Sequence, residues 1–138
     1  MKKAAPKMFI QDWGTLCNET LVCVGGKYCD MVAWLIAHKE KAEFLKEYRA
    51  RIESIIAGTN QGCAVSHENG SVLWLRQYSW KSWDNIETLL HEIYHLVHFA
   101  SKQKGIEDET EFQAYQFEYL FRNIRRKIDG RGKCSTKS

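Results

Sequence analysis

The order of hydrophobic and polar positions in the first half of the chain predicts short strands followed by a helix. Short apolar runs at Phe9-Ile10 and at residues 20–24 are bounded by polar positions and by Gly25-Gly26, which predicts one or two early strands. From Asp30, a residue type suited to an N-cap, apolar positions then recur with helical spacing as far as Gly58. This second pattern predicts one long amphipathic helix that mainly packs against the rest of the fold.

A β-hairpin is predicted in the middle of the chain. Two β-prone runs, residues 63–65 and residues 71–75, flank the tripeptide Glu68-Asn69-Gly70. An Asn-Gly pair between two such runs is the strongest short-range signal for a hairpin. We therefore expect a hairpin over about residues 62–78.

Two amphipathic helices are predicted after the hairpin. Asp84-Asn85-Ile86-Glu87 has the capping-box pattern, and apolar residues then recur with helical spacing up to a stop near Gly105. A last helix is predicted from near Asp108 to Gly130. Together, these elements predict an α+β fold with a small antiparallel or mixed sheet.

Length and charge indicate a single domain with a basic tail. The 138 residues match the size of one domain, which we place at residues 1–130, followed by a basic and disordered tail at 131–138. Residues 122–138 hold seven basic residues and one acidic residue, so the net charge of residues 1–121 is −3, with thirteen basic and sixteen acidic residues. Because nucleic-acid affinity depends on clustered Lys and Arg, an acidic body argues against a nucleic-acid partner.

Targeting and cysteine patterns point to the cytoplasm. The longest apolar run, residues 31–37, is far shorter than a membrane-spanning helix, and residues 1–7 carry positive charge without the apolar stretch of a secretory signal. We therefore expect no membrane partner. The five cysteines are odd in number and form no CxxC pair, which favours reduced thiols over a disulfide framework or a cysteine zinc site.

The motif that carries chemistry lies inside the helix predicted after residue 84. His91-Glu92-Ile93-Tyr94-His95 is an HExxH sequence, and residues four apart lie on one face of a helix, so both imidazoles can reach one zinc ion. Glu92 then lies beside the position of a zinc-activated water. His98 is about 10 Å along the helix axis from His91, which argues for a place outside the coordination shell.

A catalytic zinc site needs a third protein ligand, and the next helix offers carboxylates. Glu111 is our choice, because Ala114 three residues later is small enough to let this helix approach the metal helix closely. Glu111 also fits an acidic first turn at a helix start, so a capping role competes with this interpretation. The alternative ligands are Glu107, Asp108 and Glu118.

Together, these residues resemble the gluzincins, which are zinc peptidases with HExxH followed by a glutamate ligand, and most of all the short members encoded by bacteriophages. The resemblance covers about residues 72–120, including Ala114-Tyr115 after the glutamate. It implies a minimal zincin-like fold with zinc held by His91, His95 and Glu111, and with Glu92 as catalytic base. Independently of the resemblance, Tyr115 is a candidate to assist, by a hydrogen bond to a ligand histidine or to the developing oxyanion, although a core aromatic role competes.

The function predicted from these residues is zinc-dependent hydrolysis of peptide bonds, in the host cytoplasm if the protein is encoded by a phage. A peptide or protein is the expected substrate, and it would pair with the edge of a strand at residues 72–77. One alternative is a catalytically silent zincin-fold module that zinc stabilises for binding or assembly. Another is a DNA-linked protease like the SprT-like proteins, but their third ligand is a histidine, and none follows His98.

Overall fold

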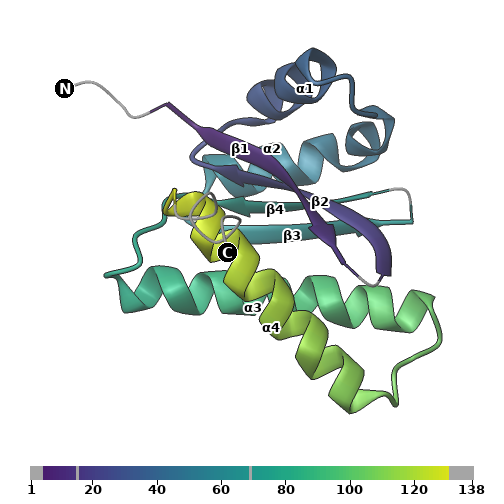
Figure 1. The fold of residues 1–138 in the computed structure, drawn as a ribbon. Coiled ribbons are helices and arrows are strands. Elements are labelled where there is room, and N and C mark those ends of the chain that lie inside the picture. The colour runs from purple at the N-terminus through teal and green to yellow at the C-terminus, as the bar shows by residue number, and fades with distance from the viewer. Residues whose placement is uncertain (1–4, 15, 69, 131–138) are drawn as a thin grey trace.

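A four-stranded sheet with helices on both faces forms the protein (Figure 1). The computed structural model describes residues 5–14, 16–68 and 70–130; the predicted tail at 131–138 lies outside them. In chain order the elements are β1 (Lys7–Trp13), β2 (Leu16–Val24), α1 (Tyr28–Ala37), the 3-10 helix η1 (Glu43–Tyr48), α2 (Arg49–Ala57), β3 (Gly62–His67), β4 (Gly70–Leu75), α3 (Trp83–Gln103) and α4 (Thr110–Ile128).

The sheet has the order β1-β2-β4-β3 and contains both strand orientations. β1 pairs antiparallel with β2, and β3 pairs antiparallel with β4, whereas β2 and β4 are parallel. The expected α+β class with a mixed sheet is therefore confirmed, as are the early strands and the hairpin. Parallel strands need a long connection, and residues 25–69, which contain α1, η1, α2 and β3, supply it.

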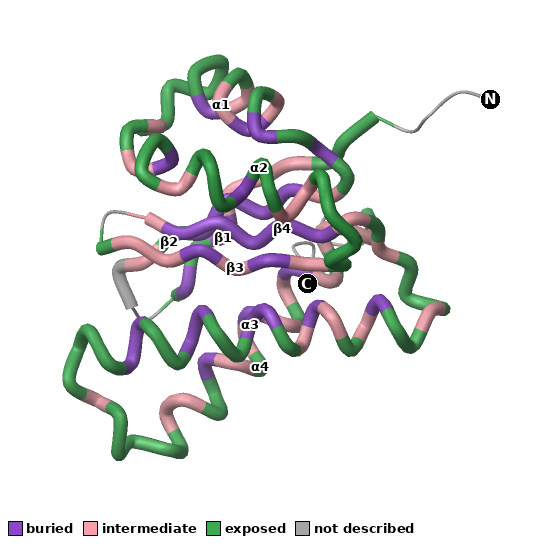
Figure 2. Tube along the Cα trace, turned by 180° about the vertical axis from the view of Figure 1, so that it is seen from behind, coloured by how far each residue is buried: buried purple, intermediate pink, exposed green. Residues whose placement is uncertain are grey.

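Two apolar layers, one on each face of the sheet, make the core (Figure 2). On one face, α1, η1 and α2 bury Met31, Leu45 and Ile52. On the other face, α3 and α4 bury residues at helical spacing, among them Ile93 and Leu120. Because period-two alternation sends neighbouring strand residues to opposite faces, each strand contributes to both layers.

The prediction of one long helix from Asp30 to Gly58 is wrong. A helix over these residues would be about 40 Å long, whereas a nine-residue strand spans about 30 Å, so its ends would leave the sheet. The chain instead ends α1 at a left-handed residue, Lys39 (φ 57°), and the Glu40 backbone N–H donates to the Leu35 carbonyl. Asp30 is not the N-cap; its carboxylate accepts from the backbone N–H of Lys27, which holds that position.

The last two helices are present, with different starts from those expected. α3 begins after Ser82, whose hydroxyl accepts from the Asn85 backbone N–H at 3.2 Å, so Ser82 and not Asp84 is the cap. α4 begins at Thr110 and crosses α3 obliquely rather than returning antiparallel to it (Figure 1). None of the helices in the described ranges is long and apolar enough to cross a membrane.

The strand at residues 72–77 was expected at the edge of the sheet, and this prediction is wrong. β4 lies between β2 and β3, and β3 is the edge strand beside it. The hairpin signal specifies that β3 and β4 pair, but it does not say which of them also pairs with β2. The free edge next to α3 therefore belongs to Gly62–His67.

Candidate metal centre

α3 carries the HExxH residues on the flank of an otherwise buried helix. Leu89, Ile93 and Leu96 recur at helical spacing and are almost fully buried under the sheet. This packing fixes the rotation of α3 about its own axis. His91 and His95 then lie on an exposed side of the helix, as the four-residue spacing predicts.

The two histidine rings lie side by side. The Nε2 atoms of His91 and His95 are 3.0 Å apart, and the ring planes are nearly perpendicular. One potential ligand atom from each of His91, Glu92 and His95 lies within 4.8 Å of the others. Among the His, Cys, Asp and Glu side chains of the described ranges, these three form the group that is close enough to hold a metal ion. We call these three residues the His-Glu-His group.

Glu92 is the buried member of the group, with 7% of its surface exposed. It lies against the first residue of β3: a Cβ atom added at Gly62 would be 3.1 Å from Glu92 Cγ and 2.7 Å from Thr88 Cγ2. Burial raises the pKa of the Glu92 carboxyl above its usual range, and the neighbouring His91 partly offsets the shift. Glu92 is therefore a carboxylate with an increased affinity for a proton.

The electrostatic surroundings of His95 favour its neutral form. Desolvation lowers its pKa, and coulombic interactions with His91, His98 and Arg51 lower it further. A neutral imidazole keeps a lone pair for a metal ion. Tyr94, which lies between the two histidines in the motif, is exposed and stacks on His98 with the ring centroids 5.7 Å apart.

The donor set fits zinc. Two imidazole nitrogens bonded to one tetrahedral zinc at about 2.1 Å lie about 3.4 Å apart, so the observed 3.0 Å between the Nε2 atoms needs only a small rotation of the rings. Imidazole and carboxylate ligands are also those that zinc commonly takes in catalytic sites. The exposure of both histidines leaves their nitrogens accessible to an ion from solvent.

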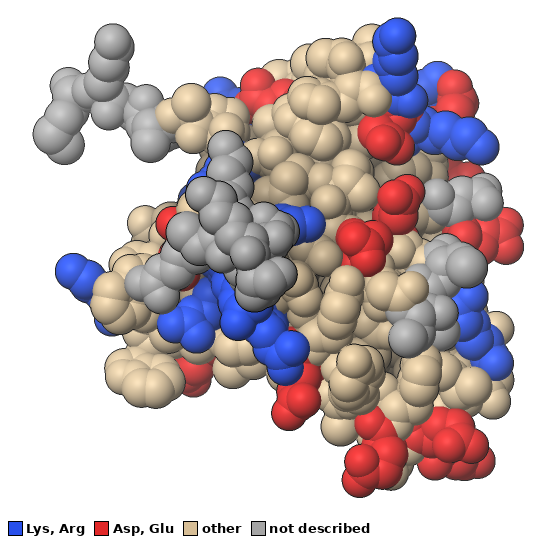
Figure 3. Space-filling view, viewed as in Figure 1, with Lys and Arg blue, Asp and Glu red and all other residues tan. Residues whose placement is uncertain are grey.

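Glu111 is placed in the first turn of α4, where it is exposed and is not part of the His-Glu-His group. The buried stripe of α4 contains Gln116, Leu120 and Ile124, and helical geometry puts Glu111 on the opposite side. Figure 3 shows acidic side chains gathered around the start of this helix. The predicted ligand role of Glu111 is untested by this arrangement and stays a prediction. The alternative ligands Glu107, Asp108 and Glu118 are exposed and also outside the group.

Two further expectations about α4 are affected by its packing. Ala114 is exposed, so it does not provide the close approach between helices that we expected. Tyr115 is 58% exposed and is an electrostatic neighbour of Tyr119, whose hydroxyl donates to Asp12 Oδ1 at 3.2 Å. Tyr115 is therefore near the side of α4 that contacts β1, and its assisting role stays a prediction.

Sequence reasoning missed Gly62 as part of the site. It lies in a recess with His91, Glu92 and Thr88, and its missing side chain makes room for Glu92. A glycine at the start of a predicted strand is a signal for close approach of another element, although it does not say which one. In the structure, the approaching element is α3, which packs against β3 at this position.

No protein-family model, curated protein or solved structure matches the chain. The residues of the His-Glu-His group and their arrangement are therefore the basis for the function proposed below.

Proposed function

We propose that the protein is a zinc-dependent metallopeptidase of the gluzincin type, with a minimal zincin-like fold. One observation carries the proposal: two exposed imidazoles with Nε2 atoms 3.0 Å apart lie next to a buried carboxylate on the same helix. A metal site that serves only stability needs no buried acid with a raised pKa beside its ligands. This feature favours catalysis over a purely structural role.

In the proposed reaction, His91 and His95 hold the metal and Glu92 handles the proton. Bound zinc would supply a Lewis acid that polarises the scissile carbonyl and makes water more acidic. Glu92 accepts a proton from the attacking water and then delivers it to the leaving amine. Because burial raises the pKa of Glu92, holding the proton between these steps costs less than it would on an exposed glutamate.

The proposed substrate is an extended peptide that pairs with the free edge of β3. This strand lies at the edge of the sheet, and its first residue touches Glu92. Main-chain hydrogen bonds along an exposed edge can hold a peptide without regard to most of its side chains. The edge of β3 thus replaces residues 72–77 as the strand that pairs with the substrate.

The identity of the third ligand distinguishes the peptidase from its alternative. If Glu111 completes the site, Glu92 stays free to act as a base. If Glu92 itself coordinates the metal, as its place in the His-Glu-His group permits, no base is left. The protein would then be the catalytically silent, zinc-stabilised module. The two functions therefore differ in which glutamate is needed for zinc binding.

Zinc content separates these possibilities. Elemental analysis should be carried out on untagged wild-type protein and on the Glu111→Ala, Glu92→Ala and His95→Ala variants. Glu43→Ala serves as a control at an exposed glutamate of η1, which packs on the other face of the sheet. For the peptidase we expect about one zinc per chain, lost in Glu111→Ala and His95→Ala but kept in Glu92→Ala and Glu43→Ala. That protein should also cleave members of a peptide library.

Two other results would contradict the peptidase. Zinc that is lost in Glu92→Ala and kept in Glu111→Ala would indicate the silent module. Failure of the wild type to bind zinc, even after the metal is added, would argue against both functions.

A further inference from the structure

A small cavity opens near the C-terminal half of α3, away from the His-Glu-His group. It has a volume of about 140 Å³ and lies between the ends of β2, β3 and β4 and one side of α3. Such a volume has room for a few waters or for one small planar group. Trp13, Leu96 and Ala100 are its buried apolar members.

The polar wall of the cavity is held in place by a directed chain of hydrogen bonds. The Trp13 indole N–H donates to the Thr20 hydroxyl at 2.8 Å, and the Thr20 and Ser71 hydroxyl oxygens are 2.7 Å apart. Ser71 in turn donates to the Glu19 carbonyl at 3.1 Å. Since Ser71 uses its proton there, Thr20 must donate to Ser71. The shape of this wall is therefore set before any ligand arrives.

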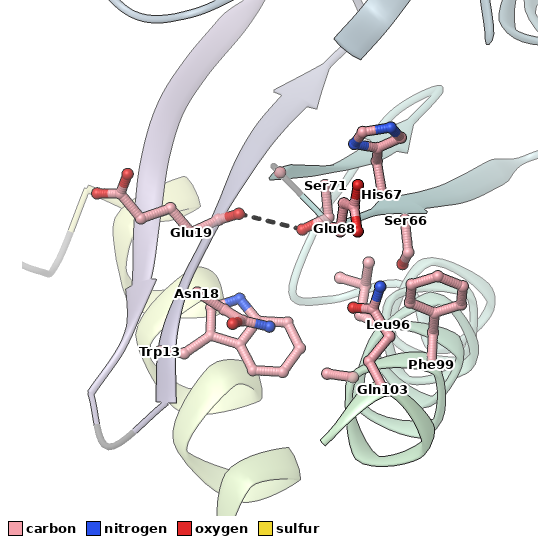
Figure 4. A pocket seen from close by; sticks show the side chains of 12 residues that line it. Trp13, Asn18, Glu19, Ser66, His67, Glu68, Ser71, Leu96, Phe99 and Gln103 are labelled. Atoms are coloured by element: carbon pink, nitrogen blue, oxygen red, sulfur yellow. Dashed lines mark hydrogen bonds between the residues drawn. The ribbon is translucent and has the colours of Figure 1, made fainter. Parts of the chain in front are cut away.

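Three side chains around the cavity, those of Asn18, Glu68 and Gln103, carry oxygen atoms that can accept hydrogen bonds (Figure 4). Asn18 and Trp13 lie on one side, Gln103 lies across from them, and Glu68 lies near the hydroxyl of Ser71, whereas the carboxylate of Glu19 points away. No Lys or Arg is among the lining residues. His67, the other ionisable lining residue, has its Nε2 atom 3.6 Å from a Glu47 carboxylate oxygen.

We propose that this cavity binds the guanidinium group of an arginine side chain. A guanidinium is planar, always charged and a donor of five N–H groups, which suits one carboxylate and two amide oxygens beside an indole. Glu68 supplies the negative charge, and Asn18 and Gln103 supply neutral acceptors.

The position of the cavity indicates that the arginine belongs to a peptide substrate. This part of the inference rests on the proposed function. Phe99 lines the cavity and follows Glu92 by seven residues on α3, a separation of about 10 Å along the axis. An extended peptide covers that distance in about three residues. A peptide on the free edge of β3 would therefore place an arginine in the cavity about three residues from the scissile bond.

Binding is tested first without any cleavage, on the full chain. N-acetyl-argininamide is titrated into ¹⁵N-labelled protein while the indole N–H signal of Trp13 is followed, and the neutral isostere N-acetyl-citrullinamide is titrated in parallel. We expect a saturable shift with the arginine compound and none with the citrulline compound. Glu68→Gln should weaken binding about tenfold or more, because a charge-assisted hydrogen bond is lost.

Two more variants make the binding test specific. Gln103→Lys places a cation in the cavity and should abolish binding. Glu53→Gln removes an exposed carboxylate on α2 that pairs with Arg49, and it should leave the affinity unchanged. Equal shifts with the arginine and citrulline compounds, or equal affinities in wild type and Glu68→Gln, would overturn the inference even if the protein cleaves peptides.

A cleavage assay tests whether the cavity binds an arginine of the substrate. Peptides with arginine or citrulline three residues from a cleaved bond are compared by kcat/KM, and wild type should prefer arginine whereas Glu68→Gln should not. If the wild type has no preference for arginine over citrulline, the cavity does not bind an arginine of the substrate. If the argininamide binds as expected but zinc-loaded protein cleaves no peptide, the cavity inference is supported and the proposed function fails.

Discussion

At the scale of single residues, Glu92 combines burial, contact with β3 and closeness to two imidazoles. Its neighbours on α3 at positions 91 and 95 are exposed, although all three belong to one short motif. The difference arises because Glu92 is on the flank of the helix that approaches Gly62. The same five residues thus supply two accessible imidazoles and a desolvated acid.

Glu92→Gln tests the proton-transfer role directly. The amide keeps the size and most contacts of the side chain, but it cannot accept a proton at neutral pH. We expect peptide hydrolysis to fall by about a hundredfold to ten-thousandfold, with zinc content unchanged by elemental analysis. An active Glu92→Gln variant, or one that loses its zinc, would exclude Glu92 as the base.

The cysteines give a second prediction at this scale. Burial raises the pKa of the Cys23 thiol to about 12, so the thiol stays protonated well above pH 8, whereas Cys29 is exposed. Because the thiolate is the reactive form, iodoacetamide at pH 8 should label Cys29 at least about a hundredfold faster than Cys23. Peptide mapping by mass spectrometry measures both rates. Unfolding in guanidinium chloride should bring them close together; a difference that persists there would contradict the cause given.

At the scale of elements, one arginine closes the end of α2. The Arg76 guanidinium donates to the carbonyls of Gly58 and Ile56 and, through Nε, to that of Asn60, at 2.9 to 3.1 Å. The last carbonyls of a helix have no partner within it and attract positive charge. Arg76, just after β4, therefore ties the end of α2 to the sheet.

Arg76→Met should lower the free energy of unfolding by about 2 kcal/mol, since it removes charge-assisted hydrogen bonds to several carbonyls while keeping much of the apolar stem. Urea unfolding followed by circular dichroism measures the change. Arg122→Met alters an exposed arginine on α4 and should change stability by less than about 0.5 kcal/mol. Equal losses in the two variants would show that Arg76 has no special role.

At the scale of the whole molecule, the approach of β3 to α3 connects the sheet to the candidate site. Gly62 permits this approach because it has no side chain where Thr88 and Glu92 pack. The face of α3 that touches β3 also leads to the cavity near Phe99. A change in the separation of these two elements should therefore affect stability and the site together.

Gly62→Ala tests this connection. Its Cβ would lie 2.7 Å from Thr88 Cγ2, too close for real atoms, so α3 must shift. We expect a loss of about 1 to 3 kcal/mol in urea unfolding, with a weaker peptidase activity because Glu92 moves. Adding Thr88→Ser removes the closest atom and should restore part of the stability. If Gly62→Ala were as stable as wild type, the close packing of β3 on α3 would be contradicted.

The local pattern of the sequence was sufficient to predict several elements and the closeness of the two histidines in the candidate site. The hairpin, α3 and the pairing of His91 with His95 depend on contacts between residues close in the chain, and these follow from turn chemistry and helical spacing. The raised pKa of Glu92 was not predictable in this way, because it requires β3 to cover that residue.

Only the tertiary structure decided the order of the strands, the break between α1 and α2, and the positions of Glu111 and Tyr115. Periodicity reports which side of an element is apolar, but not how long the sheet beneath it is or which neighbour it meets. A helix longer than the sheet had to break near Lys39, and α4 had to bury Leu120 against the sheet, which turned Glu111 outward. These outcomes depend on distant parts of the chain sharing one core of finite size, and no local spacing records that constraint.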